Sequence, residues 1–295
     1  MVISKHSSRI WLVRGLSGLG ILIFSVIGVA LYLGTLYIAP KNKPVPPPPS
    51  YWLSQTIHFK NDQLVGWFVP INTTKPSQCV LLLHGLKSSR KGLIPIAQFL
   101  RDAGFSIFMF DFRGHGESKP DTVTFGLHES EDARAALSWL HEHGHCTHIG
   151  VWGHSMGGAA AILGPSPLPV DAFVLDSTYG SIEQATQHRI VHIMGHPFGD
   201  LVSPLLLAQI PWRLHASYAQ LRPSEAITHV HAPTLIIYGT RDQYVYLDEA
   251  QSLFKASGAT NKELWIVPGA SHGKTHSIDP GRYAQKVVTF FKKNL

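Results

Sequence analysis

The sequence predicts an α/β domain with a mostly parallel sheet, preceded by one membrane-spanning helix. Three observations support this prediction. Residues 15–39 are apolar and contain no charged side chain. From residue 79 onward, short apolar runs alternate with helical patterns, which is typical of parallel strands joined by crossover helices. The composition, 44% hydrophobic and 15% charged, allows a sizeable buried core.

The apolar segment 15–39 is long enough to act as a membrane anchor, because about 20 helical residues cross the ~30 Å hydrocarbon layer. A cleavable signal peptide is the alternative, but its apolar region would span only about 7–15 residues. Three basic residues lie in the N-terminal segment 1–14 and two follow the span. This bias predicts a cytoplasmic N-terminus and an extracytoplasmic domain, periplasmic if the protein is bacterial.

The net charge of +6 does not indicate a nucleic-acid partner. Residues 1–50 contain five basic side chains and none of the 19 acidic ones, so the excess charge flanks the apolar segment and the remaining chain is nearly balanced. Residues 40–51 are rich in proline and predict an extended, semi-rigid spacer between the bilayer and the domain.

Residues 52–295 are expected to form the folded domain. Alternating apolar and polar residues around Asn61-Asp62 predict an antiparallel hairpin at residues 56–69. Continuous apolar runs predict buried strands at residues 79–83, 106–110, 149–152, 172–175, 234–237 and 264–267. Helices are expected at residues 93–102, 129–143 and 280–292, and directly after residue 155. The long, apolar segment 177–223 predicts a small helical cap.

The pentapeptide Gly153-His154-Ser155-Met156-Gly157 lies between a predicted strand and a predicted helix. This is the setting of the G-x-S-x-G nucleophile elbow, in which a sharp turn exposes a serine Oγ and leaves no room for a Cβ two residues before or after it. The sequence therefore predicts Ser155 as a nucleophile. A buried serine in a glycine-rich turn is the structural alternative.

A nucleophilic serine needs a base and an orienting acid, each in a loop at the carboxyl end of a strand. Asp242 follows the strand at 234–237, and His272 follows the strand at 264–267, in the order that this fold requires. Asp176 is a rival acid, although it is expected rather to shape the start of the cap. The backbone N–H groups of Leu86 and Met156 are the candidate oxyanion donors.

Five motifs follow one another along the domain. They are His84-Gly85, Asp111-Phe112-Arg113-Gly114-His115-Gly116-Glu117-Ser118, Gly153-His154-Ser155-Met156-Gly157-Gly158, Gly239-Thr240-Arg241-Asp242 and Gly269-Ala270-Ser271-His272. Together they resemble the α/β-hydrolase superfamily, most closely its monoacylglycerol-lipase-like and serine-aminopeptidase-like branch. The resemblance implies a Ser155, Asp242 and His272 triad, oxyanion donors at Leu86 and Met156, and an eight-stranded sheet. In that sheet the strands at 79–83 and 149–152 are neighbours.

This neighbour relation would bring Cys79 and Cys146 to one level at the start of their strands. A disulfide is then plausible in an extracytoplasmic domain, with two buried free thiols as the alternative. We expect no metal and no cofactor. The histidines at 141, 143, 145 and 148 straddle a helix end and a turn, where surface positions are expected rather than a metal site.

The predicted function is hydrolysis of a carboxylic ester or thioester of a small or lipid-derived acyl substrate through an acyl-enzyme. A serine peptidase or aminopeptidase-like amidase is the second candidate. A binding module without catalytic activity is the candidate from another class, and an intact set of Ser, Asp and His argues against it.

Overall fold

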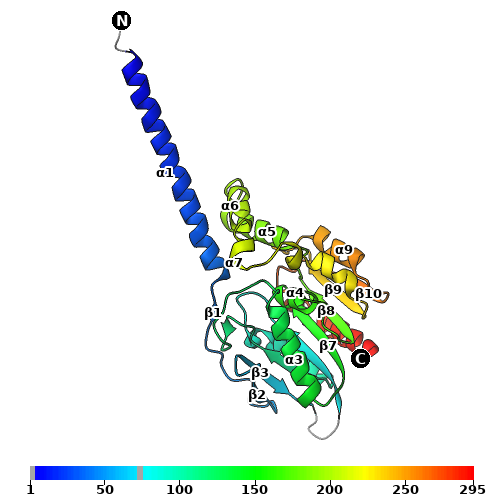
Figure 1. Ribbon diagram of the computed structural model, residues 1–295. Coiled ribbons are helices and arrows are strands. Elements are labelled where there is room, and N and C mark those ends of the chain that lie inside the picture. The colour runs from blue at the N-terminus through cyan, green and yellow to red at the C-terminus, as the bar shows by residue number, and fades with distance from the viewer. Residues whose placement is uncertain (1–3, 72–75) are drawn as a thin grey trace.

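The computed structural model describes residues 4–71 and 76–295, with side chains in the first helix described at positions 14–18, 20–21 and from 24 onward. That helix, α1 (Ser4–Ile38), projects from the domain as a long rod (Figure 1). Within the described residues, no helix combines the length and the apolarity that crossing a bilayer requires. The predicted anchor 15–39 falls in α1, and the side chains at 19, 22 and 23 lie outside the description.

The domain is built on one sheet of eight strands in the order β10-β9-β8-β7-β4-β5-β3-β2. The only antiparallel pairs of this sheet are β2–β3, the predicted hairpin, and β3–β5, so the predicted mostly parallel sheet is confirmed. The strands are β2 (Gln55–Phe59), β3 (Leu64–Val69), β4 (Ser77–Leu83), β5 (Ser106–Phe110), β7 (Cys146–His154), β8 (Ala172–Asp176), β9 (Thr234–Gly239) and β10 (Lys262–Val267). Strands β4 and β7 are neighbours, as the family resemblance implies.

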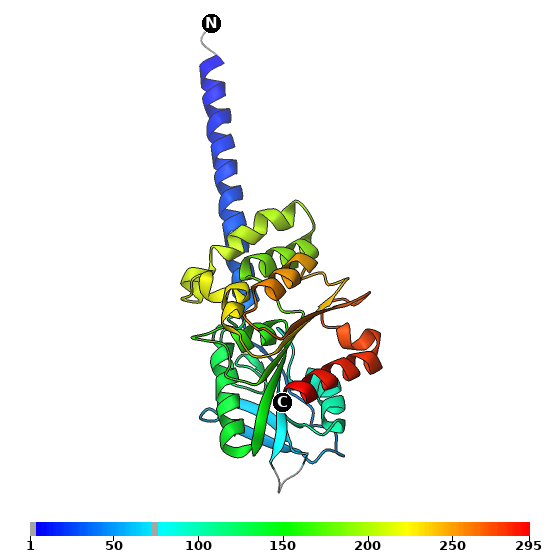
Figure 2. The same cartoon turned by 90° about the vertical axis from the view of Figure 1, so that its right-hand side faces the viewer.

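Helices cover both faces of the sheet because parallel strands are apolar on both sides. On one face lie α2 (Ile94–Asp102), which follows a 3₁₀ turn η1 (Arg90–Leu93), and α11 (Pro280–Asn294) (Figure 2). On the other face lie α3 (Glu129–His143), α4 (Met156–Ile162) and α9 (Leu247–Ala256). In α3 the fully buried side chains recur at helical spacing, at Ala133, Ala136, Leu137 and Leu140.

The segment between β8 and β9 forms the cap. It contains α5 (Ile182–Met194), α6 (Phe198–Leu207), α7 (Ile210–Arg213), η2 (Ala219–Leu221), α8 (Pro223–Ala226) and η3 (Ile227–His229). The cap is tied to α1: the side chain of Gln209 donates to the Ala30 carbonyl at 3.0 Å, and Arg213 donates to the Leu31 carbonyl at 2.8 Å. The last turns of α1 therefore pack against the cap.

The proline-rich segment 40–51, predicted as an extended spacer between the bilayer and the domain, packs along the domain instead. Its first residues form β1 (Lys41–Asn42), which pairs with β6 (His115–Gly116), and the Ile38 carbonyl accepts a hydrogen bond from the Val123 N–H at 2.9 Å. The segment follows the domain surface because Asn42 and the backbone find hydrogen-bond partners there, including the Ser118 carbonyl at 2.6 Å. The C-terminal end of α1 consequently belongs to the domain.

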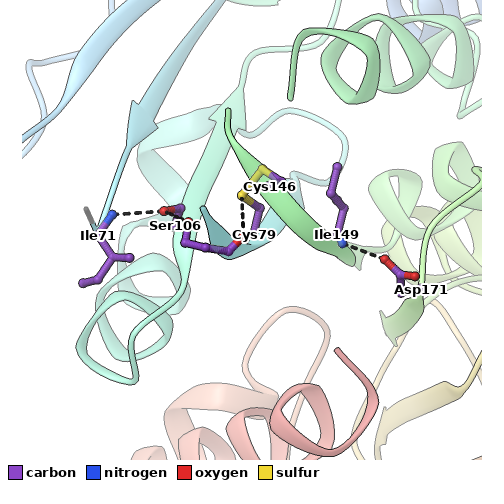
Figure 3. Close-up of a disulfide and its surroundings, with 7 residues drawn as sticks. Ile71, Cys79, Ser106, Cys146, Ile149 and Asp171 are labelled. Atoms are coloured by element: carbon purple, nitrogen blue, oxygen red, sulfur yellow. Dashed lines mark hydrogen bonds between the residues drawn. A yellow bond between two sulfur atoms is a disulfide. The ribbon is translucent and has the colours of Figure 1, made fainter. Parts of the chain in front are cut away.

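A disulfide joins Cys79 of β4 to Cys146 at the start of β7 (Figure 3), with the two Cα atoms 5.6 Å apart. The two strands are adjacent, so this covalent bond reinforces the centre of the sheet. It lies at the end of the strands remote from Ser155, which follows β7.

Removing this bond is expected to destabilise the domain without changing its active site. The double replacement of Cys79 and Cys146 by Ala should lower the free energy of unfolding by roughly 2–5 kcal/mol, because the bond closes a loop over a sequence separation of 67 residues. Urea unfolding with and without dithiothreitol measures the effect. The double variant serves as control, since it should not respond to the reductant; an unresponsive wild type would contradict the prediction.

Candidate active site

Ser155 sits at the turn between β7 and α4 in a backbone conformation, φ 51° and ψ −115°, that non-glycine residues rarely adopt. The flanking glycines explain how the turn closes. A Cβ on Gly153 would lie 2.6 Å from the Gly158 nitrogen, and a Cβ on Gly157 would collide with the Leu83 carbonyl. The turn therefore requires glycine on both sides of the serine.

Three side chains from separate loops meet at this turn. His272, in the loop after β10, places its Nε2 3.1 Å from the Ser155 Oγ. Asp242, in the loop after β9, places its two carboxylate oxygens 2.8 and 3.0 Å from the His272 Nδ1. Because a carboxylate only accepts, Nδ1 carries the hydrogen, and Nε2 is left to accept the Ser155 hydroxyl proton.

The surroundings of Asp242 favour its ionised form. Burial disfavours its charge, but the hydrogen bond and charge of His272 outweigh burial and lower the pKa of Asp242 below its ordinary value. The backbone N–H groups of Tyr244 and Val245 also donate to its Oδ1, at 2.9 and 3.0 Å. These contacts fix the carboxylate in place against the imidazole.

The rival acid, Asp176, has a different position. Its carboxylate is buried and accepts hydrogen bonds from Thr275 at 2.5 Å and Tyr283 at 2.7 Å. Burial raises the pKa of Asp176. Its backbone carbonyl accepts the Ser155 N–H at 2.9 Å. Asp176 thus ties the nucleophile turn to α10 (Thr275–Ile278) and α11, and it also accepts a hydrogen bond at 3.1 Å from Ser177, where the predicted cap begins.

The two candidate oxyanion donors come from two different segments around Ser155. Met156 is the first residue of α4, so its N–H has no partner within the helix and points out of the positive helix end. Leu86 follows β4, and its side chain lines the same pocket as Ser155 and Met156. The arrangement fits the stabilisation of a developing negative charge on a substrate oxygen.

Two neutral imidazoles hold the Leu86 loop. His84 accepts the Phe112 N–H on Nε2 at 3.1 Å and donates from Nδ1 to the Gly85 carbonyl at 2.8 Å. His115 accepts the Lys87 N–H on Nε2 at 3.2 Å. Burial lowers the pKa of His84 to about 3 and also lowers the pKa of His115, so both stay neutral acceptors at physiological pH. The Arg113-Gly114-His115-Gly116 stretch is thus a support for this loop.

His115→Phe is expected to lower kcat while leaving KM largely unchanged, because the Lys87 N–H loses its acceptor and the Leu86 amide loses its position. The loss should approach the ~10²–10³-fold effect of removing one oxyanion donor. Steady-state kinetics on an acyl ester measure it, with the exposed His141→Phe as control. Equal kinetics of the two variants would contradict this role.

The pocket in front of Ser155 has walls from three parts of the chain. It is lined mainly by apolar side chains, and also by Tyr37 of α1, Arg189 of α5 and Tyr244. No sequence pattern predicts Tyr37 or Arg189 in the site, because Tyr37 lies inside an apolar run and Arg189 lies in an ordinary helical pattern. These two residues join the site only through the packing of α1 and the cap, whereas Tyr244 lies in the loop that carries Asp242.

Comparison with known proteins shows similarity to the α/β-hydrolase fold. A family model for the alpha/beta hydrolase fold matches residues 78–213. The uncharacterized protein Rv2307c of Mycobacterium tuberculosis is 30% identical over 219 residues, which are 74% of this chain and 70% of that protein. The structure of the Pyrococcus furiosus esterase Pf2001 is 25% identical and superposes with a TM-score of 0.71, covering 86% of this chain and 98% of the esterase. A bacterial membrane phospholipase A shares the fold at 16% identity and a TM-score of 0.59, over 99% of both chains.

Proposed function

Because the chain belongs to the α/β-hydrolase family, we propose that it is a serine hydrolase that cleaves a carboxylic ester or thioester. The observation that carries this proposal is the continuous hydrogen-bond chain from Asp242 through His272 to the Ser155 Oγ, with distances of 2.8 and 3.1 Å. The likeness to an esterase structure at 25% identity is in agreement with it.

The geometry supports the following sequence of steps. The Ser155 Oγ attacks the substrate carbonyl carbon as its proton passes to His272 Nε2, and the carbonyl oxygen becomes an oxyanion facing the Leu86 and Met156 amides. The C–O bond to the alcohol then breaks, and His272 returns the proton to the leaving oxygen. Water, deprotonated by His272, next attacks the carbonyl carbon of the acyl-enzyme. The bond from this carbon to the Ser155 Oγ then breaks, His272 returns the proton to Oγ, and the acid product is released. Asp242 keeps the imidazole in one tautomer throughout.

The substrate is proposed to be a small or lipid-derived acyl ester. Support comes from the apolar lining of the pocket, which includes Leu86, Phe125, Met156 and Ile182. Apolar walls suit an acyl chain, whereas an aminopeptidase substrate needs an acceptor for its free amine. Among the described lining residues there is no Asp or Glu to supply one.

Membrane attachment through residues 15–39, with the domain outside the cytoplasm, is part of the same proposal. The absence of charge over these residues supports it, as do apolar side chains exposed on α1 and on the adjacent α6, such as Phe24 at 78% and Phe198 at 64%. The disulfide suits an oxidising compartment. Protease digestion of sealed vesicles tests the topology. We expect the domain to be protected in inverted vesicles, and its digestion there would mean that it lies on the cytoplasmic side.

A fluorophosphonate probe tests the catalytic proposal directly. Folded wild-type protein should be labelled at one site, and Ser155→Ala should not be labelled. The absence of labelling of folded wild type would favour a binding module without catalysis. A panel of acyl esters against aminoacyl amides then separates esterase from peptidase, with turnover of the esters expected.

A further inference from the structure

A cation in the cap faces the apolar pocket of the candidate active site. Arg189 extends from α5, is half-buried, and lines the pocket together with Ser155 and His272. Its guanidinium lies 4.2 Å from the centre of the Tyr244 ring, and that ring lies 5.1 Å from the His272 ring. One aromatic ring therefore separates Arg189 from the catalytic base.

Arg189 forms no ion pair with a carboxylate among the described residues, and acids of α5, α9 and the Asp242 loop have other partners. Glu183 binds Arg222 at 2.6 Å, Glu249 binds His188 at 3.0 Å, and Asp242 binds His272. Of the described residues that line the pocket, Arg189 alone carries a permanent charge. A half-buried guanidinium without a carboxylate partner keeps its N–H donors available, so this position can bind an anion that the fold itself does not supply.

Two hydroxyl groups lie beside the guanidinium. Tyr37 of α1 is close to both Arg189 and Thr186, and it lines the active-site pocket as well as the adjoining cavity, which Thr186 also lines. Thr186 is 1% exposed, and within the described part of the chain its Oγ1 forms no hydrogen bond of normal geometry, although the Tyr37 hydroxyl lies close to it. A buried hydroxyl without such a bond is costly, and this one lies one helical turn from Arg189.

We propose that Arg189, Tyr37 and Thr186 form a subsite for an oxyanion, a phosphate or a carboxylate, carried by the ester substrate. A guanidinium binds such a group through two parallel N–H donors, and two hydroxyls can add donors to the remaining oxygens. This inference rests on the proposed function and narrows it: the preferred substrates are anionic acyl esters. It also gives the last turn of α1 a part in substrate selection.

Two substrate pairs test the proposal and locate the anion. In the first pair the charge is on the alcohol side, with a monoacylglycerol compared with the corresponding acylglycerol 3-phosphate. In the second pair it is on the acyl side, with 4-nitrophenyl pentanoate compared with mono-4-nitrophenyl glutarate. The full-length wild type should prefer the anionic member of one pair by roughly 10- to 100-fold in kcat/KM, the range of a charge-assisted hydrogen bond.

Arg189→Gln should abolish this preference chiefly through KM, and Arg189→Lys should restore part of it. Arg222→Gln is the matched control, because it removes the same charge from the cap at a side chain that pairs with Glu183 and Glu225. If Arg189 only stacks on Tyr244, its replacement lowers turnover of neutral and anionic esters alike. Such an equal loss, or no anionic preference in either pair of the wild type, would overturn the subsite.

A binding experiment separates this inference from the proposed function. Calorimetric titration of Ser155→Ala with butyl phosphate, and with butanol as the neutral reference, needs no turnover. If the wild type hydrolyses none of the four esters, the proposed function fails, and the titration decides the subsite. Binding of butyl phosphate that disappears in Ser155→Ala/Arg189→Gln supports it, and no binding, or binding that persists, rejects it.

Discussion

Ser155→Ala is expected to lower kcat for ester hydrolysis by about 10⁶-fold, to the level that oxyanion stabilisation and binding alone provide. The expectation follows from the 3.1 Å contact between the Ser155 Oγ and His272 Nε2, since no proton transfer can occur without the hydroxyl. Steady-state kinetics with a 4-nitrophenyl ester measure the loss. The exposed Ser166→Ala is the control and should behave as wild type.

The other two members of the triad should not add to this loss. His272→Ala is expected to cost about as much as Ser155→Ala, and the double variant should be no worse than either single one, because the residues act as a unit. Asp242→Asn should cost about 10⁴-fold, since an amide allows the wrong imidazole tautomer. The exposed Asp248→Asn is its control. Additive losses in the double variant would contradict a shared proton path.

The lowered pKa of Asp242 gives this site a defined acid dependence. A carboxyl whose folded pKa is depressed contributes stability that is present above its unfolded pKa and is lost as the pH falls through the folded pKa. The difference in unfolding free energy between wild type and Asp242→Asn should therefore shrink as the pH is lowered below about 4. Urea unfolding at a series of pH values measures it. If the difference in unfolding free energy grew as the pH fell, the pKa of Asp242 would be raised in the folded protein, not lowered.

The sheet and the grouping of Ser155, Asp242 and His272 could be predicted because their determinants are local in the sequence. An apolar run predicts a buried strand, and a Gly-flanked serine after such a strand predicts a nucleophile elbow. Asp242 and His272 could be predicted because each follows a predicted strand. Parallel strands bring their carboxyl ends to one edge of the sheet, so residues that follow such strands lie close together. The register between β4 and β7 similarly brings Cys79 and Cys146 within reach of one another.

The walls of the pocket could not be predicted because they depend on packing between segments far apart in the chain. Tyr37 reaches the site only because α1 ends against the domain, where Tyr37 stacks near Phe125 with ring centres 4.8 Å apart. A proline-rich composition predicts stiffness but not the surface on which the chain lies, so the pairing of β1 with β6 was missed. Arg189 was missed because no sequence pattern shows that a helical arginine lacks a carboxylate partner.

The second large effect, a loss of stability, is expected at a buried ion pair whose arginine directly follows the Leu86 loop in the chain. Arg90 is 2% exposed and pairs with the fully buried Asp111, and its guanidinium carbon lies 4.7 Å from the centre of the Trp67 ring. Asp111 also accepts the Arg90 N–H at 2.6 Å and the Glu117 N–H at 2.9 Å. These bonds fix the loop that carries His115.

Burial raises the pKa of Asp111 despite the neighbouring guanidinium, so desolvation outweighs the attraction. A carboxyl whose folded pKa is raised contributes stability that is present below its unfolded pKa and is lost as the pH rises through the folded pKa. The ionised pair is therefore not a net source of stability at neutral pH. Removing only one partner is nevertheless costly, because the other charge is left buried.

Arg90→Met should accordingly lower the free energy of unfolding by about 3–5 kcal/mol, whereas the double variant Arg90→Met/Asp111→Leu should recover much of that loss. The surface variant Arg101→Met, which separates an exposed pair with Asp102, is the control and should cost less than about 1 kcal/mol. Urea unfolding of the four proteins gives the comparison. If Arg90→Met costs no more than Arg101→Met, or if the double variant is less stable than Arg90→Met, the expected cost of leaving one buried charge unpaired is contradicted. Because the same carboxylate positions the loop of His115, Arg90→Met should also lower kcat, and the double variant should recover stability without recovering activity.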